Sequence, residues 1–149
     1  MSEHVNLVKL CVGADAVDDL RHWQMGRIAQ RNAAGLDPRP RHVTRMWPKR
    51  ADEILDGGSL YWVFKGAILA RQSIEALEEV IGDDGIRRCA IIMSPEIVLV
   101  EGRPRRPFQG WRYLSASDAP SDLTNQSGDA LGLPPELAIA LNEIGVVAR

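Results

Sequence analysis

Residues 59–65 (SLYWVFK) constrain the fold more than any other part of the chain. The segment is rich in aromatic and β-branched residues and has no breaker inside it, which is typical of a β-strand. Gly66 follows as a turn, and residues 67–72 (AILARQ) have strand character again. Residues 59–72 therefore predict a β-hairpin.

Strand-like and helix-like segments are mixed along the rest of the chain. Further strands are predicted at residues 5–12, 42–47, 87–93, 96–101 and 111–114. Helices are predicted at residues 15–33, 49–55, 74–81 and 136–144. Asp15 is the expected N-cap of the first helix, and the strands on either side of Ser94-Pro95 are expected to form a second hairpin.

This order of elements favours an α+β fold, because hairpins dominate the middle and no regular βαβ series occurs. We expect a curved or barrel-like, mostly antiparallel sheet with three to four helices packed outside it. A chain of 149 residues suggests a single domain, residues 1–149.

The composition and the first residues of the chain argue against several classes of protein. The chain is 45% hydrophobic and 26% charged with a formal net charge of −2, so it is not a polycation overall. Its start lacks the basic and apolar regions of a signal peptide, and no run approaches the ~18 apolar residues of a membrane span. We expect a cytoplasmic protein with no membrane partner. Cys11 and Cys89 lie in apolar runs and are expected to be buried thiols, with a disulfide left open if their strands are neighbours.

Charge is segregated along the chain. Residues 39–50 hold five cations and no acid, and residues 103–112 hold four arginines and no acid. Residues 75–84, in contrast, hold five acids and no cation. If the two basic segments converge, they form one positive face, for which a phosphate backbone is the natural partner. The alternative is that these are solvated loop arginines that add solubility.

Residues 106–114 (RPFQGWRYL) combine that charge with three of the chain's eight aromatic residues. Bases stack on aromatic rings for about 1–3 kcal/mol each. Trp111, between Gly110 and Arg112, is the ring that we expect to be partly exposed. Tryptophan and tyrosine at strand positions also commonly pack in a core or an interface, so a structural role stays open.

No catalytic or metal motif accompanies these segments. His4, His22 and His42 lie apart from one another, and neither a phosphate-binding loop nor a nucleophile elbow occurs, so no metal or cofactor is expected. The cations around His42 should disfavour its protonation and leave it a neutral acceptor, although a plain surface histidine is the alternative. Asp118 and Asp122 either pair with Arg106 or Arg112 or bind a cation.

Several strings resemble those of an uncharacterised bacterial protein family. They are PKRADEILDGG at residues 48–58, WVFKG at 62–66, RQ at 71–72, FQGWRYL at 108–114 and DAP at 118–120. The resemblance covers nearly the whole chain and implies no established activity.

A second similarity is confined to residues 49–58. The pattern K-R-x-x-E-I-L-x-G-G, followed at once by a strand, resembles the opening of ASCH and other PUA-like domains. Those are small β-barrels that bind RNA or modified bases, and the similarity implies that Lys49, Arg50 and Lys65 lie at a ligand cleft. The strand here lacks the charged E-x-R ending usual in ASCH domains, which leaves the type of ligand open.

The leading hypothesis is therefore an RNA-binding, PUA-like domain with a basic, aromatic cleft. Phosphate contacts are assigned to Arg45, Lys49, Arg50, Lys65, Arg71, Arg106 and Arg112. Gln72 and Gln109 would read base edges or a ligand amide, and Trp111 would stack. One alternative is a small enzyme acting on a phosphorylated or nucleotide-like substrate, with Asp118 or Glu53 as base. Another is a structural or dimerisation protein without a ligand, and the oligomeric state stays open.

Overall fold

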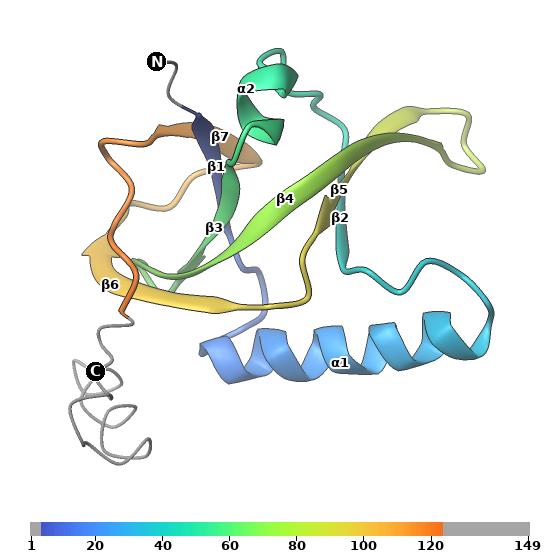
Figure 1. The fold of residues 1–149 in the computed structure, drawn as a ribbon, viewed down its shortest axis with the longest axis horizontal. Coiled ribbons are helices and arrows are strands. Elements are labelled where there is room, and N and C mark those ends of the chain that lie inside the picture. Colours follow the sequence, from blue (N-terminus) through green and yellow to red (C-terminus); the bar gives the residue numbers. More distant parts are fainter. Residues whose placement is uncertain (1–3, 124–149) are drawn as a thin grey trace.

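The computed structural model describes residues 4–123, which form one mixed seven-stranded sheet and two helices (Figure 1). The strands are β1 (Val5–Leu10), β2 (Arg41–Thr44), β3 (Ser59–Phe64), β4 (Ala67–Ile81), β5 (Arg87–Met93), β6 (Val98–Pro104) and β7 (Trp111–Ser115). The helices are α1 (Val17–Ala33) and α2 (Ala51–Leu55). The predicted α+β composition is confirmed, but the described residues contain two helices, not three or four. The helix predicted at residues 136–144 lies outside the described residues. Neither described helix is long and apolar enough to cross a membrane.

β3 lies inside the sheet and is buried along its whole length. It pairs antiparallel with β4, with Ser59 opposite Ser73, so the first predicted hairpin is confirmed. The turn residues Lys65 and Gly66 both have positive φ, 48° and 86°, as a type I′ hairpin turn requires. β1 pairs with β3 in parallel, and β7 pairs with β1 antiparallel to complete that end of the sheet.

β4 is one strand of 15 residues, so the helix predicted at residues 74–81 is wrong. Its first half pairs with β3, and its second half continues past a bulge at Ile74/Ala76 to pair with β5. The three glutamates of this segment suggested a solvated helical face. The segment pairs with β5 across the short turn at residues 82–86, and these cross-strand hydrogen bonds override the local preference for helix.

β5 and β6 do not form the expected second hairpin. Both run antiparallel to β4, β5 beside residues 74–81 and β6 beside residues 67–71, so they follow one another along β4. β2 pairs with β5 and ends the sheet on that side. It is shorter than the strand predicted at residues 42–47.

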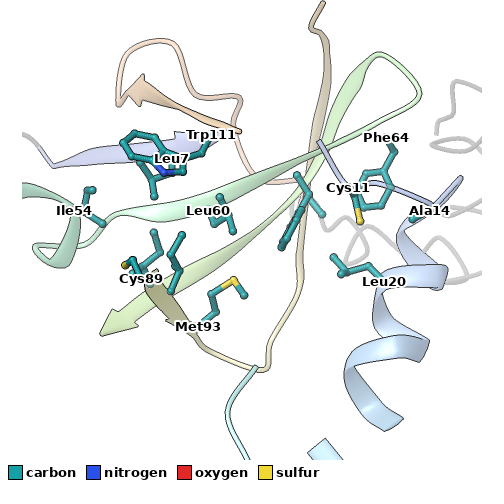
Figure 2. Packing of buried hydrophobic residues seen from close by; sticks show 14 of the residues in the cluster. Leu7, Cys11, Ala14, Leu20, Ile54, Leu60, Phe64, Cys89, Met93 and Trp111 are labelled. Carbon is teal, nitrogen blue, oxygen red and sulfur yellow. The ribbon is translucent and has the colours of Figure 1, made fainter. Parts of the chain in front are cut away.

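The sheet is open, so the expected barrel is not closed. It carries buried clusters on its two faces, because neighbouring residues of β3 point in opposite directions. Figure 2 shows the larger cluster, which contains Leu60 of β3, Leu20 of α1 and Ile54 of α2. Cys11 and Cys89 belong to it as free, buried thiols, as predicted, and burial raises the pKa of each to about 11.

α1 is held against the sheet by few side chains. Only Leu20 and Gln24 of this helix are buried. The Gln24 and Gln72 amides form a reciprocal pair, with Nε2 to Oε1 distances of 2.9 and 2.7 Å. Gln72 Oε1 also accepts from Trp62 Nε1 at 2.9 Å, and Gln72 Nε2 donates to the Ser94 carbonyl at 3.0 Å. This buried network ties α1 to β3, β4 and the end of β5.

The first turn of α1 differs from the prediction. The N-cap is Ala16 rather than Asp15. Asp19 stabilises this end of the helix, because its Oδ2 accepts from the backbone N–H groups of Asp15 and Ala16.

Replacing Gln72 should destabilise the fold strongly. In Gln72→Ala, the Trp62 indole N–H and the Gln24 amide lose their partner in the interior, and each unsatisfied buried group costs about 1–3 kcal/mol. We expect the free energy of unfolding to fall by about 2–4 kcal/mol in urea titrations. Gln30→Ala, on the exposed side of α1, is the matched control. A loss for Gln72→Ala no larger than that of the control would contradict the assigned role.

Candidate functional site

The basic run of residues 39–50 does not form one surface, because β2 divides it. Arg39 and Arg41 precede or begin β2 and line a cavity beside α1. Arg45, Lys49 and Arg50 follow β2 and lie in the connection to α2. The run therefore does not contribute to one positive face, and the structure gives two separate candidate sites.

The second half of the run packs against β7. Tyr113 Oη accepts from the backbone N–H of Lys49 at 2.7 Å and of Arg50 at 3.2 Å. The Trp111 indole N–H donates to the Met46 carbonyl at 2.9 Å. The two basic segments of the sequence, about 60 residues apart, therefore meet at β7.

Their cations lie on both sides of this strand. Alternation sends Trp111 and Tyr113 to the face that carries the 46–50 segment, and Arg112 to the other face. On that other face, Phe108 lies beneath two guanidinium groups, with centroid distances of 5.1 Å to Arg105 and 5.6 Å to Arg112. β7 pairs only with β1 among the described residues, so its second edge is open. We call this arrangement the basic edge; its cations are Arg45, Lys49, Arg105, Arg106 and Arg112.

No carboxylate of the described residues lies within ion-pair distance of any basic-edge cation. Other predicted phosphate ligands are neutralised. Arg50 pairs with Glu53 at 2.7 and 2.8 Å, and Arg71 pairs with Asp122 at 2.8 Å through two nitrogens. Lys65, in the β3–β4 turn, lies 3.8 Å from Asp15 and is not part of the basic edge.

Two predicted contact residues are buried. Trp111 is only 4% exposed and packs edge-on against Tyr113, so the expectation that it is partly exposed is wrong. Gln72 is fully buried and its amide is occupied by protein partners, which removes it from any surface contact with a base. Gln109 is exposed in the loop that enters β7.

Asp122 forms an ion pair with an arginine, as one of the predicted alternatives had it, but the arginine is not the predicted one. Asp122 binds Arg71 instead of Arg106 or Arg112, and that guanidinium lowers the pKa of the Asp122 carboxyl. Asp118 contributes its backbone carbonyl, which accepts from Arg103 at 2.7 Å. Arg50 likewise lowers the pKa of Glu53, which makes this carboxylate a weaker base.

The second site is a cavity of about 490 Å³ between α1 and the chain that leads into β2. It is lined by four arginines, two from each side: Arg27, Arg31, Arg39 and Arg41. Arg39 and Arg41 belong to the basic run of residues 39–50, for which the sequence indicates no cavity, and Arg27 and Arg31 are outside that run. The signal in the sequence is their spacing, four apart on α1 and two apart in the chain that leads into β2. We call this site the arginine cavity.

His42 also lines the arginine cavity and meets Trp62 edge-on, with ring centroids 5.9 Å apart. Burial first, and then the charges of Lys9 and Arg27, lower the pKa of His42 from 6.5 to about 4. The prediction of a neutral imidazole agrees with this direction. Its main cause is desolvation, and the cations responsible lie on β1 and α1 rather than in the run around His42.

Among the described residues, no cluster of three or more histidine, cysteine or carboxylate side chains is arranged to hold a metal ion.

Comparison with known proteins shows which family the chain belongs to. The model of a family described as protein of unknown function (DUF1489) matches residues 7–147. The chain belongs to the DUF1489 family. This match includes both the basic edge and the arginine cavity of the DUF1489 chain. Neither the curated proteins nor the solved structures contain a significant match.

Removing the Tyr113 hydroxyl should loosen the junction of the two basic segments in this DUF1489 protein. Tyr113→Phe keeps every charge but leaves the Lys49 and Arg50 N–H groups without their acceptor. We expect a loss of about 0.5–1.5 kcal/mol in unfolding free energy and faster hydrogen exchange at these two amides. Tyr61→Phe, in β3, is the control and should leave exchange at both amides unchanged. Unaltered exchange in Tyr113→Phe would count against the contact.

The pH dependence of stability should report His42. Its pKa is lowered to about 4 in the folded state, so the unfolded chain binds the proton first as the pH falls through 6.5. Stability is therefore complete above pH 6.5 and declines by about 1–3 kcal/mol down to pH 4. Carboxylates with lowered pKa values affect stability only at lower pH. Asp37 is an example, because Arg39 holds the pKa of its carboxyl at about 2, below its usual 3.8.

Urea titrations at pH 7, 5.5 and 4 would measure this decline. His42→Gln should remove most of it. His22→Gln, at an exposed histidine of α1, is the matched control. An equally steep decline in His42→Gln would show that another group is responsible.

Proposed function

We propose that this protein binds single-stranded RNA along the basic edge. The observation that carries the proposal is the meeting of the two basic segments at β7, with five cations that have no carboxylate partner among the described residues. Unpaired, exposed cations bind phosphates and release counterions, which is the main source of affinity for a nucleic-acid backbone.

The geometry favours a single strand over a duplex. Cations flank both faces of an open strand edge, and Phe108 offers a half-buried ring between two guanidinium groups. A flexible chain follows such an edge and stacks a base on the ring, whereas reading a duplex needs an element that enters a groove. The similarity of residues 49–58 to ASCH and PUA-like domains points to RNA as the partner.

The contacts differ from those expected from the sequence alone. Arg45, Lys49, Arg106 and Arg112 keep their assignment to phosphates, and Arg105 joins them. Phe108 replaces Trp111 as the stacking residue, and Gln109 is the amide placed to read a base edge. Arg50, Arg71 and Lys65 contribute less, because each already has a carboxylate partner.

A salt titration tests this function. Single-stranded RNA of about 12 nucleotides, followed by fluorescence anisotropy, should bind with log K falling linearly with log salt concentration. Five phosphate contacts give a slope of about −3.5. The double variant Lys49→Gln/Arg112→Gln should reduce the slope to about −2 and weaken binding at 50 mM salt by about tenfold or more.

Arg21→Gln is the matched control, since Arg21 lies on α1 and pairs with Asp18 away from β7. It should retain the wild-type slope. No binding at low salt, or the same slope in all three proteins, would refute the proposal. Sedimentation velocity on the same samples distinguishes the structural alternative, in which the open edge of β7 pairs with a second copy and the double variant changes only the oligomeric state.

A further inference from the structure

The arginine cavity carries more positive charge than its neighbours neutralise. Arg39 is fully engaged, with hydrogen bonds to the Asp37 carboxylate at 2.7 to 3.2 Å and to Glu75 at 3.1 Å. Set against four guanidinium groups, these two acids leave a net charge of +2 at the cavity. Arg27, Arg31 and Arg41 have no carboxylate partner among the described residues, and Arg31 Nε donates to the Asp37 backbone carbonyl.

One donor in the cavity wall has no partner at all. Arg41 Nε is shielded from solvent and forms no hydrogen bond with the described residues. Leaving a charged donor buried without a partner costs more than an ordinary lost hydrogen bond. Because Nε is shielded, Arg41 can meet an anion in the cavity only through the rest of its guanidinium group.

The cavity sets the size and shape of that anion. A volume of about 490 Å³ is in the range of sites for small organic ligands and far exceeds the space that a single inorganic ion needs. Pro38, Pro40 and Val43 give the wall apolar surface beside the arginines, and the exposed Gln30 amide lies at the same site. A compact group with two negative charges, attached to an organic body, matches both the charge and the apolar wall.

We propose that the arginine cavity binds a phosphomonoester group. Arg27 and Arg31 of α1 bind the phosphate from one side and Arg41 of β2 from the other. Arg39 is a positioning residue, because its carboxylate partners hold the connection between α1 and β2 in place. The phosphate belongs either to a free small molecule, such as a nucleoside 5′-monophosphate, or to the 5′ end of an RNA.

Isothermal titration calorimetry with adenosine 5′-monophosphate tests the site. We expect saturable binding to the wild-type protein, competition by inorganic phosphate and no binding of adenosine. Arg27→Gln should weaken binding tenfold or more, as should Arg41→Gln. Arg27 is exposed, so its replacement should leave the fold intact. Arg27→Gln therefore tests the site even if Arg41→Gln fails to fold.

Arg21→Gln, on the same helix but outside the cavity, is the matched control and should bind as the wild type does. Lys49→Gln should also keep full affinity for adenosine 5′-monophosphate, which separates this site from the RNA-binding basic edge. Equal binding of adenosine, unchanged affinity in Arg27→Gln, or no saturation at millimolar ligand would overturn the proposal.

A second arm identifies the source of the phosphate. RNA with a 5′-phosphate is compared with the same RNA carrying a 5′-hydroxyl, on wild-type protein and on Arg27→Gln. A preference for the phosphorylated RNA that disappears in Arg27→Gln assigns the cavity to an RNA end. Equal binding of the two RNAs, together with saturable binding of the monophosphate, assigns it to a free small molecule.

Discussion

The hydrogen bonds of Gln72 are the interaction on which the rest of the structure depends. This buried amide binds the Trp62 indole on β3, Gln24 on α1 and the Ser94 carbonyl at the end of β5. Because α1 buries only Leu20 and Gln24, the Gln24–Gln72 pair provides much of its attachment. α1 is also one wall of the arginine cavity, and the chain leading into β2 is the other. The width of the cavity is therefore set by a polar contact inside the core, because an unpaired amide there would be strongly unfavourable.

Local composition was enough to predict the parts of the fold that are determined locally. The β3–β4 hairpin follows from an aromatic, β-branched run and a Lys-Gly turn with positive φ. Residues 74–81 were mispredicted as a helix because their glutamates recur at helical spacing, while the competing strand state depends on β5. The same limit explains β5 and β6, which look like a hairpin in sequence but are both aligned along β4. Which strand a segment pairs with is a long-range property, and neither periodicity nor turn chemistry contains it.

The sequence predicted that the candidate site is positively charged, but not which of its cations are neutralised or which of its side chains are exposed. The sequence left open whether the two basic segments converge, and the structure brings them together at β7 through Tyr113 and Trp111. The sequence could not reveal that Arg71 is neutralised, because its partner Asp122 is 51 residues away, whereas the Arg50–Glu53 pair is local and follows i,i+3 spacing. Nor could it distinguish a buried amide from an exposed one in β4, where alternation sends Gln72 inward. Contact assignments therefore moved from Gln72 and Trp111 to Phe108 and Arg105.

The split of the basic run at β2 gives its two halves different chemistry. The basic edge is exposed and strung along a strand, so its charges are screened within about 8 Å at physiological salt and suit a long polyanion that makes many weak contacts. The arginine cavity gathers its charges around a half-enclosed space, where screening is weaker and converging guanidinium groups suit the proposed compact dianion. β2 has only four residues, about 13 Å of extended chain, and its ends belong to different sites. The two proposed ligands, an RNA on the basic edge and a phosphomonoester in the cavity, would thus both depend on the same short strand, which among the described residues pairs with β5 alone.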